Sequence, residues 1–123
     1  MLKLGILGLG EGRSTMSAAL QSNRYELKMI CDMKEDLVKQ REKEFDFYKS
    51  TNSYQQMLND KDIDVIAIYT PDHLHAEHVK QALLHEKHVV CTKPFVDDLS
   101  KADHHWFLQK AWSLQQSFEW LYA

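Results

Sequence analysis

The fold of this chain is decided by the stretch Leu2-Lys3-Leu4-Gly5-Ile6-Leu7-Gly8-Leu9-Gly10-Glu11-Gly12. Its first part, residues 2–7, is a short apolar run, which predicts a buried strand. Glycines then follow at alternate positions, and residues 14–22 favour a helix. A strand that ends in a glycine-rich turn before a helix is typical of an anion site, because the unpaired N–H groups of a helix N-terminus attract negative charge.

The turn has most of the features that a dinucleotide pyrophosphate needs. Gly8 can supply the tight turn, and Gly10 the close approach of the backbone to the phosphates. The third glycine of the G-x-G-x-x-G pattern would fall at position 13, which is Arg13, whereas Gly12 comes one residue early. We expect the turn, including Glu11, to lie under the pyrophosphate. Arg13 either adds positive charge near the phosphates or faces solvent, and the sequence leaves both open.

A second apolar run, residues 27–31, is closed by Asp32. A carboxylate about 20 residues after the glycines can accept both ribose hydroxyls of the adenosine and repels a 2′-phosphate. The sequence therefore favours NAD over NADP, although Lys34 lies close enough to weaken this preference. The alternative interpretation of Asp32 is a plain N-cap of the next helix.

The rest of the chain alternates helices with strands. We expect helices at residues 34–44, 53–58 and 73–84, and strands at residues 45–48, 63–69 and 88–91. In the first of these helices, Leu37 and Val38 form the inward face. This alternation predicts a doubly wound α/β fold of the Rossmann type, a parallel sheet with helices on both faces. Ser100 and Asp103 resemble a capping box that opens a further helix.

The composition fits a single domain over residues 1–123. Hydrophobic residues make up 44% and charged residues 27%, an ordinary globular mixture. The net charge of −3 gives no attraction to nucleic acid or to anionic lipid, and no apolar run approaches the roughly 20 residues of a membrane span. We expect a cytoplasmic protein in which Cys31 and Cys91 are reduced, buried thiols.

Two further segments add motifs that make the chain resemble a particular family. They are Tyr69-Thr70-Pro71-Asp72-His73-Leu74-His75 and Lys87-His88-Val89-Val90-Cys91-Thr92-Lys93-Pro94-Phe95. Together with the glycine turn and Asp32, they resemble the glucose–fructose oxidoreductase, inositol dehydrogenase and MocA family of NAD(P)-dependent oxidoreductases. The resemblance extends over residues 2–103.

The resemblance implies roles for residues in both segments. The family's Thr-Pro-Asn motif, with a histidine just inside the helix, is matched by Thr70, Pro71 and His75, with aspartate in place of the asparagine. Its Glu-Lys-Pro motif is matched by Lys93 and Pro94, and Thr92 replaces the glutamate. All five matching residues are therefore expected at the cofactor. Lys93 is the expected catalytic residue, which orients the substrate hydroxyl and assists proton transfer.

The implied reaction is hydride transfer between a nicotinamide and a sugar or polyol carbon. In the family a second, larger α/β domain supplies most substrate contacts, and 123 residues cannot encode it. From about residue 104 the chain departs from the family pattern in a tail that contains Trp106, Trp112 and Trp120, and the choice between helix and strand there stays open. Our hypothesis is a truncated member, produced by a frameshift near residue 103, that binds nucleotide and catalyses little.

The same residues have two other interpretations. A lone Rossmann domain can serve as a nucleotide sensor or an assembly module, and a homo-oligomer would cover its bare apolar surface. His73, His75 and His78 cluster, but no nearby set of cysteines or carboxylates completes a tetrahedral site, so no metal is expected. Cys91 has no evident base that would make it a nucleophile.

Overall fold

The computed structural model of the chain describes residues 1–91. The strands of the sheet are β1 Leu2–Leu7, β2 Tyr25–Cys31, β3 Ser50–Thr51, β4 Val65–Ile68 and β5 His88–Cys91. The helices are α1 Arg13–Gln21, α2 Glu35–Phe45, α3 Tyr54–Asn59 and α4 His75–Leu84, and a 3-10 turn, Asp72–Leu74, precedes α4. Three features predicted from the sequence lie outside the described residues: the residue pair Lys93 and Pro94, the helix expected after Ser100, and the tryptophan-rich tail.

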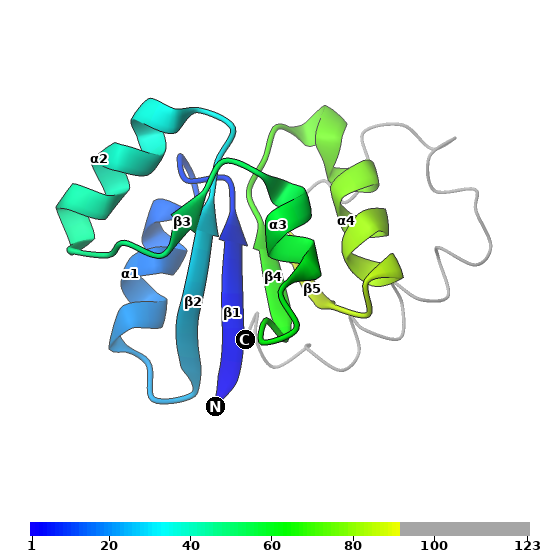
Figure 1. Cartoon of the computed structure of the whole chain (residues 1–123), viewed down its shortest axis with the longest axis horizontal. Helices are drawn as coiled ribbons and strands as arrows, with labels where there is room; N and C mark the ends of the chain where they lie inside the picture. Colours follow the sequence, from blue (N-terminus) through cyan, green and yellow to red (C-terminus); the bar gives the residue numbers. More distant parts are fainter. Residues whose placement is uncertain (92–123) are drawn as a thin grey trace.

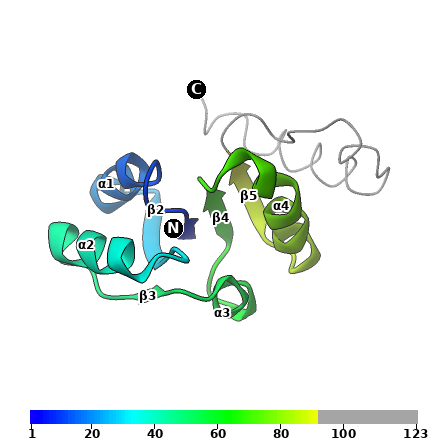
Figure 2. The ribbon, with the colours of Figure 1, turned by 90° about the horizontal axis from the view of Figure 1, so that it is seen from above.

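The strands form one parallel sheet in the order β3-β2-β1-β4-β5 (Figure 1). Viewed from above, α1 and α2 lie on one side of the sheet, and α3 and α4 lie on the other (Figure 2). The predicted doubly wound fold is therefore confirmed. Among the described residues, no helix has the length and apolar character needed to cross a membrane.

Each face of the sheet has its own core. Along β4, Val65 and Ala67 pack with α1 and α2, whereas Ile66 and Ile68 pack with α3 and α4. All four side chains are buried, because a parallel strand covered on both faces has no polar side to show to solvent. This double burial explains why the strand is an almost unbroken run of β-branched residues.

A β-bulge in β2 determines which side chains reach each core. Leu4 pairs with Leu27, but Gly5 pairs with Met29, so Lys28 is an extra residue in the ladder. The extra residue reverses the alternation, and Ile30 therefore packs on the same face as Leu27.

The prediction of a third strand at residues 45–48 is wrong. Helix α2 continues to Phe45 and ends at Asp46, which has a left-handed φ of 52°. The Phe47 N–H then bonds to the Glu42 carbonyl at 3.0 Å, and the rings of Phe45 and Phe47 pack against the core from the helix end. The third strand follows this helix end as two residues, β3.

Other predicted bounds need smaller corrections. Helix α1 begins one residue before the predicted start, at Arg13, and β4 is shorter at both ends than the predicted strand at residues 63–69. The predicted helix at residues 73–84 is divided, because the 3-10 turn precedes α4.

Candidate functional site

The carboxyl ends of β1 and β4 meet at the centre of the sheet. From β1 the chain turns toward α1 on one face, whereas from β4 it turns toward α4 on the other. The Gly8 N–H bonds to the Cys31 carbonyl at 2.9 Å, and the Tyr69 N–H bonds to the Leu7 carbonyl at 2.8 Å. Such a point, where the strand order reverses, is the place at which open α/β sheets bind their ligands.

Glycine is required at two positions of the turn after β1. Gly8 has a φ of +94°, and a Cβ there would lie 2.6 Å from the Tyr69 carbonyl carbon. A Cβ on Gly12 would lie 2.1 Å from the Gly8 oxygen. A Cβ on Gly10 would meet no atom within 4 Å. Gly8 and Gly12 therefore make the turn possible, whereas Gly10 borders open space together with the exposed Glu11.

Leu9 anchors the middle of the turn in three ways. Its side chain is fully buried in the core beneath α1 and α2. Its N–H donates to Oδ2 of Asp32 at 2.8 Å, and its carbonyl accepts from Nε of Arg41 at 2.9 Å. The N–H and the carbonyl of Leu9 are thus each held by a charged side chain from elsewhere in the fold.

Asp32 lies directly after β2 and is half-buried. Its second oxygen, Oδ1, accepts from the Lys34 N–H at 2.9 Å. The N-cap residue of α2 is Lys34, so the alternative interpretation of Asp32 as that N-cap is wrong. Each carboxylate oxygen has acceptor sites for more than one donor, so Asp32 can still accept hydroxyl groups of a ligand.

Arg13 faces α2 and not the space over the turn. Its Nε donates to Oε1 of Glu44 at 2.5 Å, and its guanidinium carbon lies 5.7 Å from the centre of the Phe45 ring. The bond and charge of Glu44 raise the pKa of Arg13, and the bond from Arg13 lowers the pKa of Glu44. Glu44 also accepts from Arg41 at 2.9 Å, so one carboxylate joins two arginines. The sequence left open whether Arg13 lies near the phosphates or faces solvent. In the structure its side chain is 56% exposed and pairs with Glu44 of α2.

Two histidines of α4 hold Thr70, which follows β4. His75 is fully buried, and its Nε2 donates to the Thr70 carbonyl at 2.6 Å. The Thr70 hydroxyl bonds to Nδ1 of His78 at 2.9 Å. Burial, and then the nearby His75, lower the pKa of His78. Pro71, the next residue, is exposed to solvent.

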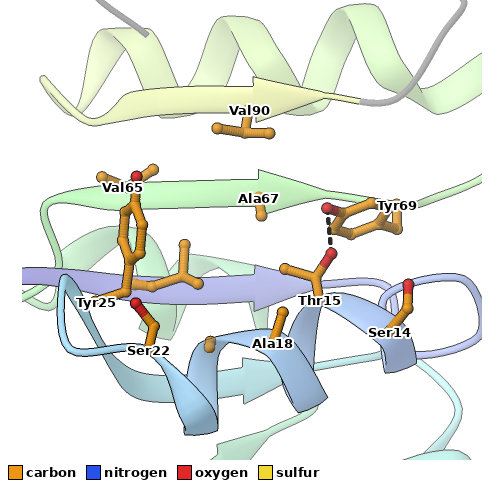
Figure 3. Close-up of a pocket in the computed structure, with 11 residues that line it drawn as sticks. Ser14, Thr15, Ala18, Ser22, Tyr25, Val65, Ala67, Tyr69 and Val90 are labelled. Atoms are coloured by element: carbon orange, nitrogen blue, oxygen red, sulfur yellow. Dashed lines mark hydrogen bonds between the residues drawn. The ribbon is translucent and has the colours of Figure 1, made fainter. Parts of the chain in front are cut away.

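A contact between hydroxyl groups links α1 to the end of β4. The Thr15 hydroxyl bonds to the Tyr69 phenol at one end of a hollow of about 460 Å³ (Figure 3). Val65, Ala67 and Val90 form the floor of this hollow on the sheet. Burial raises the pKa of Tyr69. The phenol is therefore neutral and acts here as a hydrogen-bonding group.

The described residues thus bring the glycine turn, Asp32, Thr70, Pro71 and His75 to the same edge of the sheet. Arg41, Glu44 and His78 were not assigned to this edge from the sequence. A signal for Arg41 does exist, because it follows Leu37 by four residues and Val38 by three, which places it on the inward face of the helix.

Comparison with known proteins identifies the family. The family model GFO_IDH_MocA, described as an oxidoreductase family with an NAD-binding Rossmann fold, matches residues 2–116, and the chain belongs to this family. The resemblance seen in the sequence is thereby confirmed.

Individual proteins resemble the chain in sequence or in fold. The chain is 31% identical over 102 residues to levoglucosan dehydrogenase of Pseudarthrobacter phenanthrenivorans, a match that covers 76% of this chain and 26% of the relative. The fold is similar to biliverdin reductase of Synechocystis, solved with biliverdin and NADP+, with a TM-score of 0.81, 24% identity and coverage of 92% of this chain and 35% of that one. It is also similar to GenD2 from gentamicin A biosynthesis, solved with NAD, with a TM-score of 0.80, 19% identity and coverage of 92% and 32%.

These likenesses define what the chain shares with its relatives. It carries an NAD(P)-binding Rossmann domain of this oxidoreductase family. It spans about a quarter of the length of the levoglucosan dehydrogenase that it matches. Of these two solved neighbours, one holds NADP+ and the other holds NAD.

Proposed function

We propose that the chain binds NAD at the carboxyl edge of the sheet, over the glycine turn and Thr70, for hydride transfer to or from a sugar or polyol. The observation that carries this proposal is the bond between the Asp32 carboxylate and the Leu9 N–H. It holds a carboxylate beside the turn, at the place where dinucleotide-binding folds receive the adenosine ribose.

The pyrophosphate lies over the turn in this proposal. The N-cap of α1, Gly12, has no side chain to satisfy the first N–H groups of the helix, so an anion can take that place. The open space beside Gly10 gives the phosphates room to approach the backbone.

The preference for NAD rests on the charges near the ribose. Asp32 would repel a 2′-phosphate, and a cation is needed to offset that repulsion. Glu44 already engages the guanidinium groups of Arg13 and Arg41. Lys34 has an exposed side chain and follows Asp32 closely, which makes it the cation able to reduce the preference.

The nicotinamide end is assigned to Thr70, Pro71 and His75, together with Lys93 and Pro94. The bound cofactor supplies the hydride chemistry. His75 and His78 hold Thr70 in place, so the segment that leads to Pro71 is fixed before a ligand arrives. Lys93 is proposed to hold the substrate hydroxyl and to accept or return its proton.

Two supports favour a sugar or polyol substrate. The family resemblance implies this class, and the relative described above is a levoglucosan dehydrogenase. Because the chain spans only 26% of that relative, we expect the 123-residue chain alone to bind cofactor and to catalyse little.

Fluorescence titration with NADH and NADPH tests the proposal. We expect saturable binding of both, with NADH the tighter ligand. Absence of NADH binding at millimolar concentration would refute the assignment. Light scattering on the same samples measures self-association, and a dimer that binds no dinucleotide supports an assembly module instead.

A further inference from the structure

We propose that Arg41 is a positioning residue, which fixes the phosphate-binding turn through the carbonyl of Leu9. Its effect on ligand affinity rests on the proposed dinucleotide function, whereas its effect on the turn does not. Arg41 belongs to α2 and is 32 residues from Leu9 in the chain.

The burial of Arg41 is the first support. Only 9% of the residue is exposed, although it carries a full positive charge on a helix that is otherwise rich in exposed charges. A buried charge is costly unless it is paired and hydrogen-bonded. Arg41 has both kinds of partner, the Leu9 carbonyl through Nε and the Glu44 carboxylate through Nη1. Its guanidinium is thus held in one orientation beneath the turn.

The position of Leu9 is the second support. Leu9 is flanked by Gly8 and Gly10, which have the greatest backbone freedom of any residue type. Asp32 holds the N–H of Leu9, but one bond leaves the following peptide free to rotate. The bond from Arg41 to the carbonyl fixes that second peptide, whose nitrogen belongs to Gly10.

This arrangement has a consequence for binding. A turn whose N–H groups already point in one direction loses less conformational entropy when an anion binds, so preorganisation raises affinity. Glu44 contributes by holding Arg41, and it also ties α2 to Arg13 at the start of α1. The turn and both neighbouring helices are thereby linked through one cluster of charges.

Amide hydrogen exchange in the ligand-free chain tests the positioning role. Arg41→Met keeps the long apolar stem and removes every donor. We expect exchange at the Leu9 amide, which is protected by its bond to Asp32, to accelerate at least about tenfold relative to the sheet amide of Ile30. Lys39→Met, a change at an exposed cation of the same helix, should leave the turn unaltered. Equal acceleration at the turn and in the sheet would show general destabilisation and overturn the proposal.

Binding separates positioning from simple attraction of charge. Arg41→Lys retains the positive charge but lacks the Nε–H, so we expect it to restore NADH affinity only in part, whereas Arg41→Met should weaken affinity about tenfold or more. Weaker binding with unchanged exchange at the turn would mean that Arg41 acts by charge alone, against the proposal. If the unaltered chain binds no NADH but Arg41→Met still loosens the turn, the positioning role stands and the cofactor assignment fails.

Discussion

The Asp32 carboxylate accepts a 2.8 Å hydrogen bond from the backbone N–H of Leu9, which joins the end of β2 to the middle of the glycine turn. The first prediction follows from this bond. Asp32→Asn keeps an acceptor for Leu9 but removes the negative charge. We therefore expect NADH to bind about tenfold more weakly, since charge-assisted hydrogen bonds are the stronger ones, and NADPH to lose its disadvantage.

Titration of both cofactors against both proteins measures this effect. Asp36→Asn is the matched control, because Asp36 is an exposed carboxylate in the first turn of α2. Unchanged selectivity between NADH and NADPH in Asp32→Asn would contradict the assignment of Asp32 to the adenosine ribose.

The glycines of the turn should separate stability from binding. Gly8→Ala places a Cβ against the Tyr69 backbone at a positive φ. We therefore expect the free energy of unfolding to fall by about 1–3 kcal/mol. Gly10→Ala adds a methyl group that contacts nothing, so its unfolding free energy should change by less than about 0.5 kcal/mol. NADH affinity should nevertheless fall in Gly10→Ala, because the methyl group enters the space proposed for the pyrophosphate.

Urea unfolding and NADH titration on both variants make the comparison. A Gly10→Ala chain with unaltered affinity would move the pyrophosphate away from this turn.

His78 predicts a dependence of stability on pH. Burial and the neighbouring His75 lower its pKa below the ordinary value of 6.5, against a smaller opposite effect of Glu77. The unfolded chain therefore binds the proton more readily than the folded chain does. The resulting stabilisation is present above pH 6.5 and is lost as the pH falls through the lowered pKa of the folded state.

Urea midpoints at about pH 7.5 and about pH 5 test this dependence in the unaltered chain and in His78→Gln. The variant should lose part of the difference between the two midpoints, because the contribution of His78 is removed. An identical difference in the two proteins would show that His78 does not contribute.

The two thiols should react slowly in the folded chain. Burial raises the pKa of Cys31 to about 12, and Asp32 adds to this effect. Burial also raises the pKa of Cys91 to about 12, with a contribution from Asp72. Because the thiolate is the reactive form, we expect little alkylation of either residue at about pH 8, and full alkylation of both in urea. Mass spectrometry locates the labels, and rapid labelling of Cys91 in the folded chain would reveal a thiolate that these surroundings do not favour.

The sequence predicts β1 and β5 at their observed bounds and the layered order of the whole fold. Buried parallel strands are runs of apolar residues, and their signal is local. The third strand has no such signal. Ser50 and Thr51 form a strand because they pair with Ile30 and Cys31, whereas the apolar Phe45 and Phe47 pack against the core at the end of α2. Tertiary contacts therefore decide where the third strand forms.

The same distinction applies to the candidate site. Gly8, Asp32 and Thr70 follow predicted strands, so the topology brings them to one edge. Arg41 and Glu44 belong to a charged helix, and charged residues on a helix are usually solvated. Their contacts with Leu9 and Arg13 join residues more than thirty positions apart, and no local pattern reports such pairs.

The contact of Gly8 with the backbone of Tyr69 and Thr70 has a kinetic consequence. The pairing of β1 with β2 closes a short loop and can form early, whereas the pairing of β1 with β4 closes a much longer one. A chain that has formed only its first three strands holds the turn and Asp32 but lacks the segment after β4 that contains Thr70. Cofactor binding should therefore report completion of the sheet, and a bound dinucleotide should slow unfolding of the finished domain without accelerating its folding.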